Sequence, residues 1–204
     1  MSTFDWPSSA PFQAARFESS YEANVFAATS PLGGDTQVVA IPGDRFRARV
    51  TIRATSAIDR ADVEGYFARV RPSQSLSVHR IAMHFLPRPE PLGTLRGAPQ
   101  VAGSAAVLAT QATIASATNG QTVKRGDMIG FPAQTVMITV DAVVSGGGVT
   151  LDFAPPLRYA LANGNAVTWS KPPITWAVVG MPMWSYIPGQ IAEECVVELV
   201  EVWG

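Results

Sequence analysis

Cysteine and charge are both scarce in this chain, and each scarcity excludes a class of protein. The 204 residues include one cysteine, Cys195, so no disulfide can form within the chain. Charged residues make up 15% of the sequence, well below the usual proportion. This low charge indicates either a surface that becomes covered in an assembly or simply a β-rich chain full of Ala, Thr and Gly. No run approaches the roughly 18 apolar residues of a membrane-spanning helix, so no membrane insertion is expected. A basic segment followed by an apolar run is also missing at the start, so no secretory leader is expected.

Motifs of catalysis and of metal binding are missing too, so we expect neither an enzyme nor a cofactor or metal site. His79 and His84 are five residues apart, which places them on opposite faces of one strand. The glycine run 146–148 is not followed by the lysine and helix of a phosphate-binding loop, and no serine nucleophile elbow is present. Asp141 and Asp152 flank that glycine turn and could approach each other, but aspartates beside a turn are far more often solvated.

The most informative segment that is present alternates arginine with apolar residues over 45–53. Because side chains alternate across a strand, this pattern predicts a half-buried β-strand whose outer face carries Arg45, Arg47, Arg49 and Arg53. Three interpretations remain open: a solvated face, a face that meets an acidic segment, and a nucleic-acid site. Nucleic acid is the weakest of the three, because the net charge is −1 and no aromatic residues interleave with the arginines.

The carboxyl-terminal strand, expected over 193–203, supplies an acidic partner within the same chain or a neighbouring one. It is apolar on both faces, which predicts a central place in a sheet. Together with an aromatic segment near the amino-terminus, it leads us to expect a subunit interface. The residues expected in this interface are Arg45, Arg47, Arg49, Arg53, Glu194, Glu198, Glu201 and Trp6.

The remaining pattern predicts an all-β fold with one helix. Residues 1–22 have no periodicity and are expected to be irregular, and 24–29 and 36–41 flank a Pro/Gly turn as a β-hairpin. A helical face over 56–70 begins at Ser56, a plausible N-cap with Asp59 three residues on. Further strands are expected over 75–83, 134–144, 149–153, 166–169 and 174–180.

Two proline-rich segments, 87–91 and 172–173, divide the chain. They indicate a discontinuous domain, 1–88 plus 172–204, interrupted by a small β-domain over 89–171 that is poor in charge. The last quarter of the chain is rich in tryptophan, which allows an alternative function. Trp169 and Trp184 could form an aromatic platform for sugars in a carbohydrate-binding β-module that attaches to a host surface.

The chain resembles the distal tail proteins of long, flexible-tailed bacteriophages. In the first half, the resemblance lies in Phe4-Asp5-Trp6-Pro7, in the hairpin turn over 30–34, and in the arginine strand followed by a helix. In the second half, four segments are similar to the inserted β-domain of the same proteins: 124–129, 137–142, 154–158 and 164–168.

This resemblance implies a β-sandwich domain that forms a ring, usually hexameric, interrupted by an inserted β-barrel-like domain that projects outwards. Such a ring lies at the tail tip of the virion and is assembled in the host cytoplasm. It connects the tail tube protein to the baseplate hub or tail fibre proteins, and DNA passes through its channel without specific binding. The chain has no obvious large carbohydrate-binding domain at its carboxyl-terminus, so direct receptor binding is not implied.

Overall fold

The computed structural model describes residues 3–9, 12–22, 24–29, 34, 36–40, 43–70, 80–84, 90–185 and 193–202. In this part of the chain the fold is all-β with one helix, as the sequence predicted. No helix there is long and apolar enough to cross a membrane. The chain divides into two compact units: a helix-bearing unit, 8–69 and 178–201, and a second unit, 1–7, 70–177 and 202–204. The proline-rich boundaries near 88 and 172 stay a prediction.

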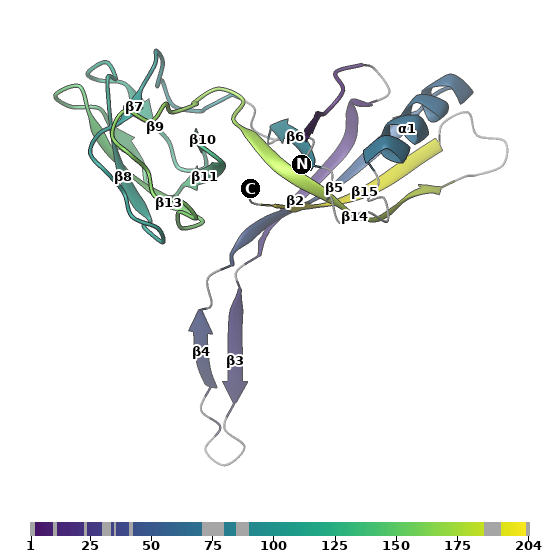
Figure 1. Cartoon of the computed structure of the whole chain (residues 1–204), viewed down its shortest axis with the longest axis horizontal. Helices are drawn as coiled ribbons and strands as arrows, with labels where there is room; N and C mark the ends of the chain where they lie inside the picture. The colour runs from purple at the N-terminus through teal and green to yellow at the C-terminus, as the bar shows by residue number, and fades with distance from the viewer. Residues whose placement is uncertain are drawn as a thin grey trace. The chain divides into compact units, whose positions relative to one another are not determined.

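The helix-bearing unit contains β2 (Ala14–Glu22), β5 (Arg45–Ala54), β15 (Glu193–Glu201) and residues 178–185 of β14 (Pro173–Ser185). These strands lie in the order β14-β15-β5-β2 (Figure 1). Both β2 and β15 run antiparallel to β5. β15 is therefore an interior strand, which confirms the position that its apolar sequence predicted.

Helix α1 (Ala57–Val70) begins where the sequence predicted. The backbone N–H of Asp59 donates to the hydroxyl of Ser56 over 3.1 Å, which caps the first turn. The Asp59 carboxylate accepts hydrogen bonds from the hydroxyl and the N–H of Thr55, and these bonds lower its pKa. Further along the helix, Val63, Phe67 and Val70 are buried, as the helical spacing predicted.

The predicted β-hairpin forms as β3 (Val25–Thr29) and β4 (Thr36–Ala40), which are antiparallel. Among the described residues, these two strands pair only with each other (Figure 1). At the base of the hairpin, the Asp44 carboxylate accepts hydrogen bonds from the Tyr21 hydroxyl, at 2.7 Å, and from the backbone N–H of Asn24, at 2.8 Å. Asp44 thus joins the two chain segments that enter and leave the hairpin.

The expectation that residues 1–22 are irregular is wrong. This stretch contains β2 and also β1 (Thr3–Asp5), a short strand of the second unit. Among the strands that the structure describes, β2 pairs with β5 alone and lies at the edge of the sheet, so it carries few apolar residues. A β-bulge between Ala14 and Arg16 further disturbs its alternation. The tertiary pairing therefore overrides a weak local pattern.

In the second unit, β6 (Arg80–His84) pairs in parallel with β1 and antiparallel with β14. β6 covers the end of the strand predicted over 75–83, and 71–79 lie outside the described residues. Trp176 of β14 is fully buried, and its indole N–H donates to the carbonyl oxygen of Met83 over 3.2 Å. Burial and the nearby Lys171 lower the pKa of His84 at the end of β6.

Residues 90–170 of the second unit surround a hydrophobic core of their own, which includes Ile114, Ile138 and Leu151. One sheet has the order β10-β11-β13-β8-β7, and β12 and β9 pair separately. The bounds are β7 Gln100–Val101, β8 Gln111–Ala115, β9 Thr122–Val123, β10 Met128–Phe131, β11 Gln134–Ile138, β12 Ala142–Val143 and β13 Val149–Ala154.

Two predicted strands in this region differ from the structure. The strand expected over 134–144 is split into β11 and β12. Between them, the Asp141 carboxylate accepts hydrogen bonds from the Arg125 N–H, at 2.7 Å, and from Lys124 Nζ, at 2.9 Å, and these bonds interrupt the strand. These contacts lower the pKa of Asp141, the Arg125 bond most strongly. The strand expected over 166–169 is reduced to isolated bridges at Ala166 and Thr168. The glycine turn before β13 forms as predicted, with Ser145 and Gly148 bonded to each other.

A buried carboxylate, Asp127, organises the same region. Its side chain is 1% exposed and accepts backbone hydrogen bonds from Leu92 at 2.6 Å, Gly93 at 3.1 Å and Lys124 at 2.8 Å. A Cβ atom at Gly93 would lie 2.3 Å from the carbonyl oxygen of Thr122, so this position requires glycine. Asp127 therefore ties the first loop of the region to the turn before β10.

Candidate subunit interface

The arginine strand β5 forms as its alternation predicted. Its five apolar side chains are all buried, whereas Arg47, Arg49 and Arg53 are exposed and Arg45 is half-buried. Burying a valine, isoleucine or phenylalanine side chain stabilises a fold by about 1.5–3 kcal/mol. The core face therefore fixes the register of β5, and the arginines must lie on the opposite face.

Glutamates on both neighbouring strands flank these arginines. Arg49 lies opposite Glu18 of β2 on one side and Glu198 of β15 on the other, and Arg53 lies opposite Glu194. We call this surface the charged face. It comprises Arg16, Glu18, Glu22, Arg45, Arg47, Arg49, Arg53, Glu194 and Glu198.

Several of these charges pair within the chain. Arg53 Nη2 lies 2.7 Å from Glu194 Oε1, and Arg47 Nε lies 2.6 Å from Glu22 Oε2, which is also 3.8 Å from Arg45 Nε. Exposed ion pairs contribute only about 0–1 kcal/mol each, so these contacts add little to stability. The arginines and glutamates of the charged face nearly balance each other in charge, which argues against a nucleic-acid site.

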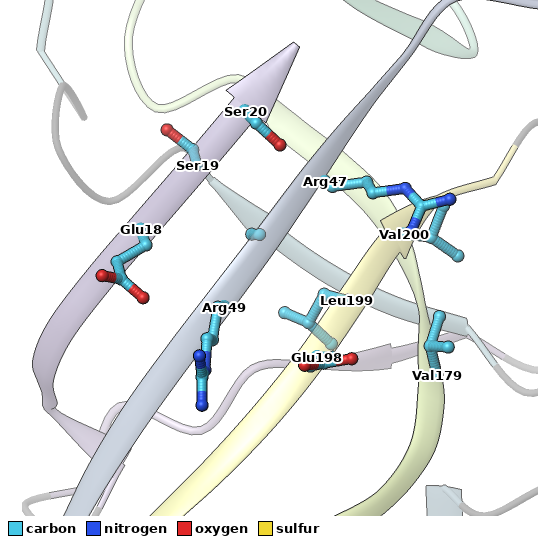
Figure 2. A pocket seen from close by; sticks show the side chains of 10 residues that line it. Glu18, Ser19, Ser20, Arg47, Arg49, Val179, Glu198, Leu199 and Val200 are labelled. Atoms are coloured by element: carbon cyan, nitrogen blue, oxygen red, sulfur yellow. The ribbon is translucent and has the colours of Figure 1, made fainter. Parts of the chain in front are cut away.

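A shallow hollow of about 270 Å³ lies in the middle of the charged face. Figure 2 shows Arg49 of β5 and Glu198 of β15 at this hollow, with Glu18 on the far side of β5. Val179 and Val200 add apolar surface to its lining. Although Arg49 lies directly across from two glutamates, neither it nor Glu198 makes an ion pair with any residue that the structure describes.

Two residues expected in the interface lie elsewhere. Glu201 is 3% exposed, and its carboxylate accepts a hydrogen bond from the Phe46 N–H over 2.9 Å on the core side of the sheet. Its odd position in β15 places it on the face opposite Glu194 and Glu198. Trp6 belongs to the second unit, where it is half-buried and its backbone N–H donates to the carbonyl oxygen of Ala82 over 3.0 Å.

The two tryptophans considered for sugar binding are both half-buried and both stacked with arginine. The Arg96 guanidinium lies 4.8 Å from the ring centre of Trp169, whose indole N–H donates to the Gly97 carbonyl over 2.9 Å. Trp169 also packs against the core of its region. In the helix-bearing unit, Arg60 of α1 lies 5.4 Å from the ring centre of Trp184. Each arginine occupies ring surface on which a sugar would stack.

The carboxylates considered for catalysis are engaged with other groups. Asp141 binds Lys124 and the Arg125 N–H, and Asp152 accepts a hydrogen bond from the side-chain amide of Gln111. Within the described ranges, no group of three or more histidine, cysteine or acidic residues is placed to hold a metal ion. His79 lies outside those ranges.

Glu18 and Glu22 belong to the charged face although the sequence did not indicate them. Both lie on the face of β2 that β5 lines with arginines, whereas Phe17 and Tyr21 lie on the other face. This period of two was the available signal, but the serines at 19 and 20 weakened it. No protein-family model matches the chain, and a search of curated proteins found no match.

Proposed function

We propose that the protein is a structural subunit of a bacteriophage tail tip. It would assemble into a ring that connects the tail tube to the baseplate hub or fibres and leaves a channel for DNA. The proposal starts from the resemblance of the sequence to distal tail proteins. One feature of the fold adds support through its strand pairing.

That feature is the hairpin of β3 and β4. An isolated two-stranded hairpin is at best marginally stable in water, and these strands pair with no third strand among the described residues. Their sequence is apolar at successive positions, 25–28 and 38–40, a pattern typical of strands that are covered on both sides. A surface of a neighbouring subunit would supply this cover. If the hairpin of each subunit contacts the next subunit, the same contact can repeat around a ring.

Electron microscopy of the purified chain at high concentration tests the proposal. We expect the unaltered protein to form rings. A variant with Phe26→Ser and Val39→Ser, which changes two positions directly across from each other in the hairpin, should lose the rings. Its circular dichroism should stay unchanged, because the hairpin is separate from the main sheet.

Thr36→Ser, an exposed position of the same hairpin, is the matched control and should still form rings. A chain that stays monomeric at every concentration, and that labelled antibodies do not find at the tail tip of purified virions, would refute the proposal. Rings that persist in the double variant would show that the hairpin is not the contact.

A further inference from the structure

We infer that the charged face binds the charged face of a second copy of this chain. The two copies would be related by a two-fold axis that runs parallel to the strands, between β5 and β15. This contact goes beyond the proposed ring, since it uses a different surface from the hairpin. It follows from the register of two strands and from the sign of the charges on them.

The register produces rows across β5 and β15 that carry one residue from each strand. Arg53 lies opposite Glu194, and two positions along, Thr51 lies opposite Val196. Arg49 then lies opposite Glu198. These two rows thus each hold one arginine and one glutamate at the same height, and a row without charge separates them. The next row along places Arg47 opposite Val200, so it would bring no like charges together in the contact.

Such a pattern is complementary to itself. Rotation about the two-fold axis exchanges the β5 and β15 positions of a row and keeps its height along the strands. Arg49 of one copy therefore faces Glu198 of the other, and Glu198 of the first faces Arg49 of the second. The Arg53 and Glu194 row repeats this exchange, so the contact brings four reciprocal pairs together.

Arg49 and Glu198 have the most to gain from a second copy. Neither makes an ion pair with a described residue of its own chain, although both are exposed (Figure 2). In the contact, Val179 and Val200 at the hollow and Val196 in the uncharged row would lose water as well. Burial of apolar surface supplies affinity, and the charge pairs supply orientation.

Other partners fit this face less well. A nucleic acid or an acidic peptide would leave Glu18, Glu194 and Glu198 facing charge of the same sign. A basic peptide would do the same to the arginines. Like charges placed together across an interface are strongly unfavourable, so a partner must alternate its charges as this face does. A second copy has that alternation in the required register.

Sedimentation velocity of the full chain over a range of concentration and salt is the first test. The hairpin double variant Phe26→Ser/Val39→Ser is used so that ring formation does not obscure smaller species. We expect a monomer–dimer equilibrium at low ionic strength that weakens as sodium chloride rises, because salt screens exposed charge pairs. A protein that is monomeric at every concentration in low salt would overturn the inference.

Charge reversal supplies the second test, in the same hairpin background. Arg49→Glu and Glu198→Arg each turn two attractive pairs into repulsive ones, which should weaken dimerisation on the order of tenfold. Mixing the two single variants restores every pair, because positions 49 and 198 again carry opposite charges wherever they face each other across the contact. We therefore expect the equimolar mixture to dimerise about as well as the parent chain.

Arg125→Glu, an equal charge change at an exposed position of the second unit, is the control and should leave dimerisation unchanged. Circular dichroism of each single variant establishes that it is folded before mixing. Dimers that resist both reversals, or a mixture no better than the single variants, would overturn the inference. Loss of rings in the hairpin variant with dimers retained would separate this contact from the proposed ring.

Discussion

The helix-bearing unit and the region 90–170 differ in how densely charged residues cover their surfaces. In the helix-bearing unit, arginines and glutamates line an open sheet face, as with Arg53 and Glu194, which are each about half exposed. In 90–170, no charged residue occurs between Arg96 and Lys124, and Asp127 is buried against backbone N–H groups. Exposed pairs can exchange partners at little cost, whereas a buried carboxylate cannot. The first arrangement suits a contact surface, and the second stabilises the loops of its own region.

Removing the buried carboxylate is the strongest way to test this contrast. Asp127→Ala leaves three backbone N–H groups without their acceptor, so we expect a loss of about 3–5 kcal/mol in the free energy of unfolding. Asp127→Asn keeps one carbonyl oxygen and should lose less. Urea unfolding followed by circular dichroism measures both, and a loss below about 1 kcal/mol for alanine would contradict the assignment.

The thiol beneath the charged face gives the next largest effect. Cys195 is fully buried, and burial, with a smaller contribution from Glu64, raises its pKa from 9.0 to about 11. The folded chain should resist alkylation at pH 8 and react rapidly in urea. Because the unfolded thiol ionises first, the free energy of unfolding should fall as the pH rises from 9.0 towards 11. Equal alkylation rates in the folded and unfolded chain would contradict this prediction.

The cap of α1 should contribute less. Ser56→Ala removes the acceptor for the Asp59 N–H, with an expected loss of about 1 kcal/mol in the free energy of unfolding. Thermal unfolding measures the loss. Ser56→Asn, which can also cap the helix, is the control and should unfold near the parent temperature. A large loss in both variants would indicate that Ser56 acts through packing instead of capping.

The smallest effect is expected at the exposed ion pair of the charged face. Arg53→Ala and Glu194→Ala should each change the free energy of unfolding by less than about 1 kcal/mol, since both side chains reach solvent. Urea unfolding of the two single variants and the double variant isolates the pair energy. A pair energy above about 2 kcal/mol would show that the face is structural and would remove the contrast with 90–170.

Long periodic elements were the part of the fold that the sequence could predict. β5 buries its whole apolar face and α1 buries Val63, Phe67 and Val70, so their periods of two and 3.6 survive in the sequence. β2 was missed because an edge strand with serines shows little alternation, and the break after β11 was missed because Asp141 turns the chain through side-chain bonds. The local sequence pattern does not reveal which strand an edge strand pairs with, or which groups a carboxylate binds.

The charged face shows the same limit. The arginine row and the acidic β15 were both predictable, but their register was not, because it depends on which residues of two distant segments pair. The glutamates of β2 were not expected at all. Glu201 is the reverse case, since its odd position in β15 already indicated the core side.

The glycine turn before β13 has a practical consequence for locating the protein. Gly146 and Gly147 have φ angles of +62° and +81°, and a Cβ atom at Gly146 would meet nothing within 4 Å. Two hydrogen bonds between Ser145 and Gly148 close the turn. Gly147 is held as well, because its N–H donates to the side-chain oxygen of Asn119 over 2.7 Å and its carbonyl oxygen accepts from the Ala117 N–H over 3.2 Å. Because the space around Gly146 is open and bonds at Ser145, Gly147 and Gly148 hold the turn on both sides of it, a short epitope inserted at Gly146 would provide a site for antibody or gold labelling. Such a label would test the tail-tip location proposed above.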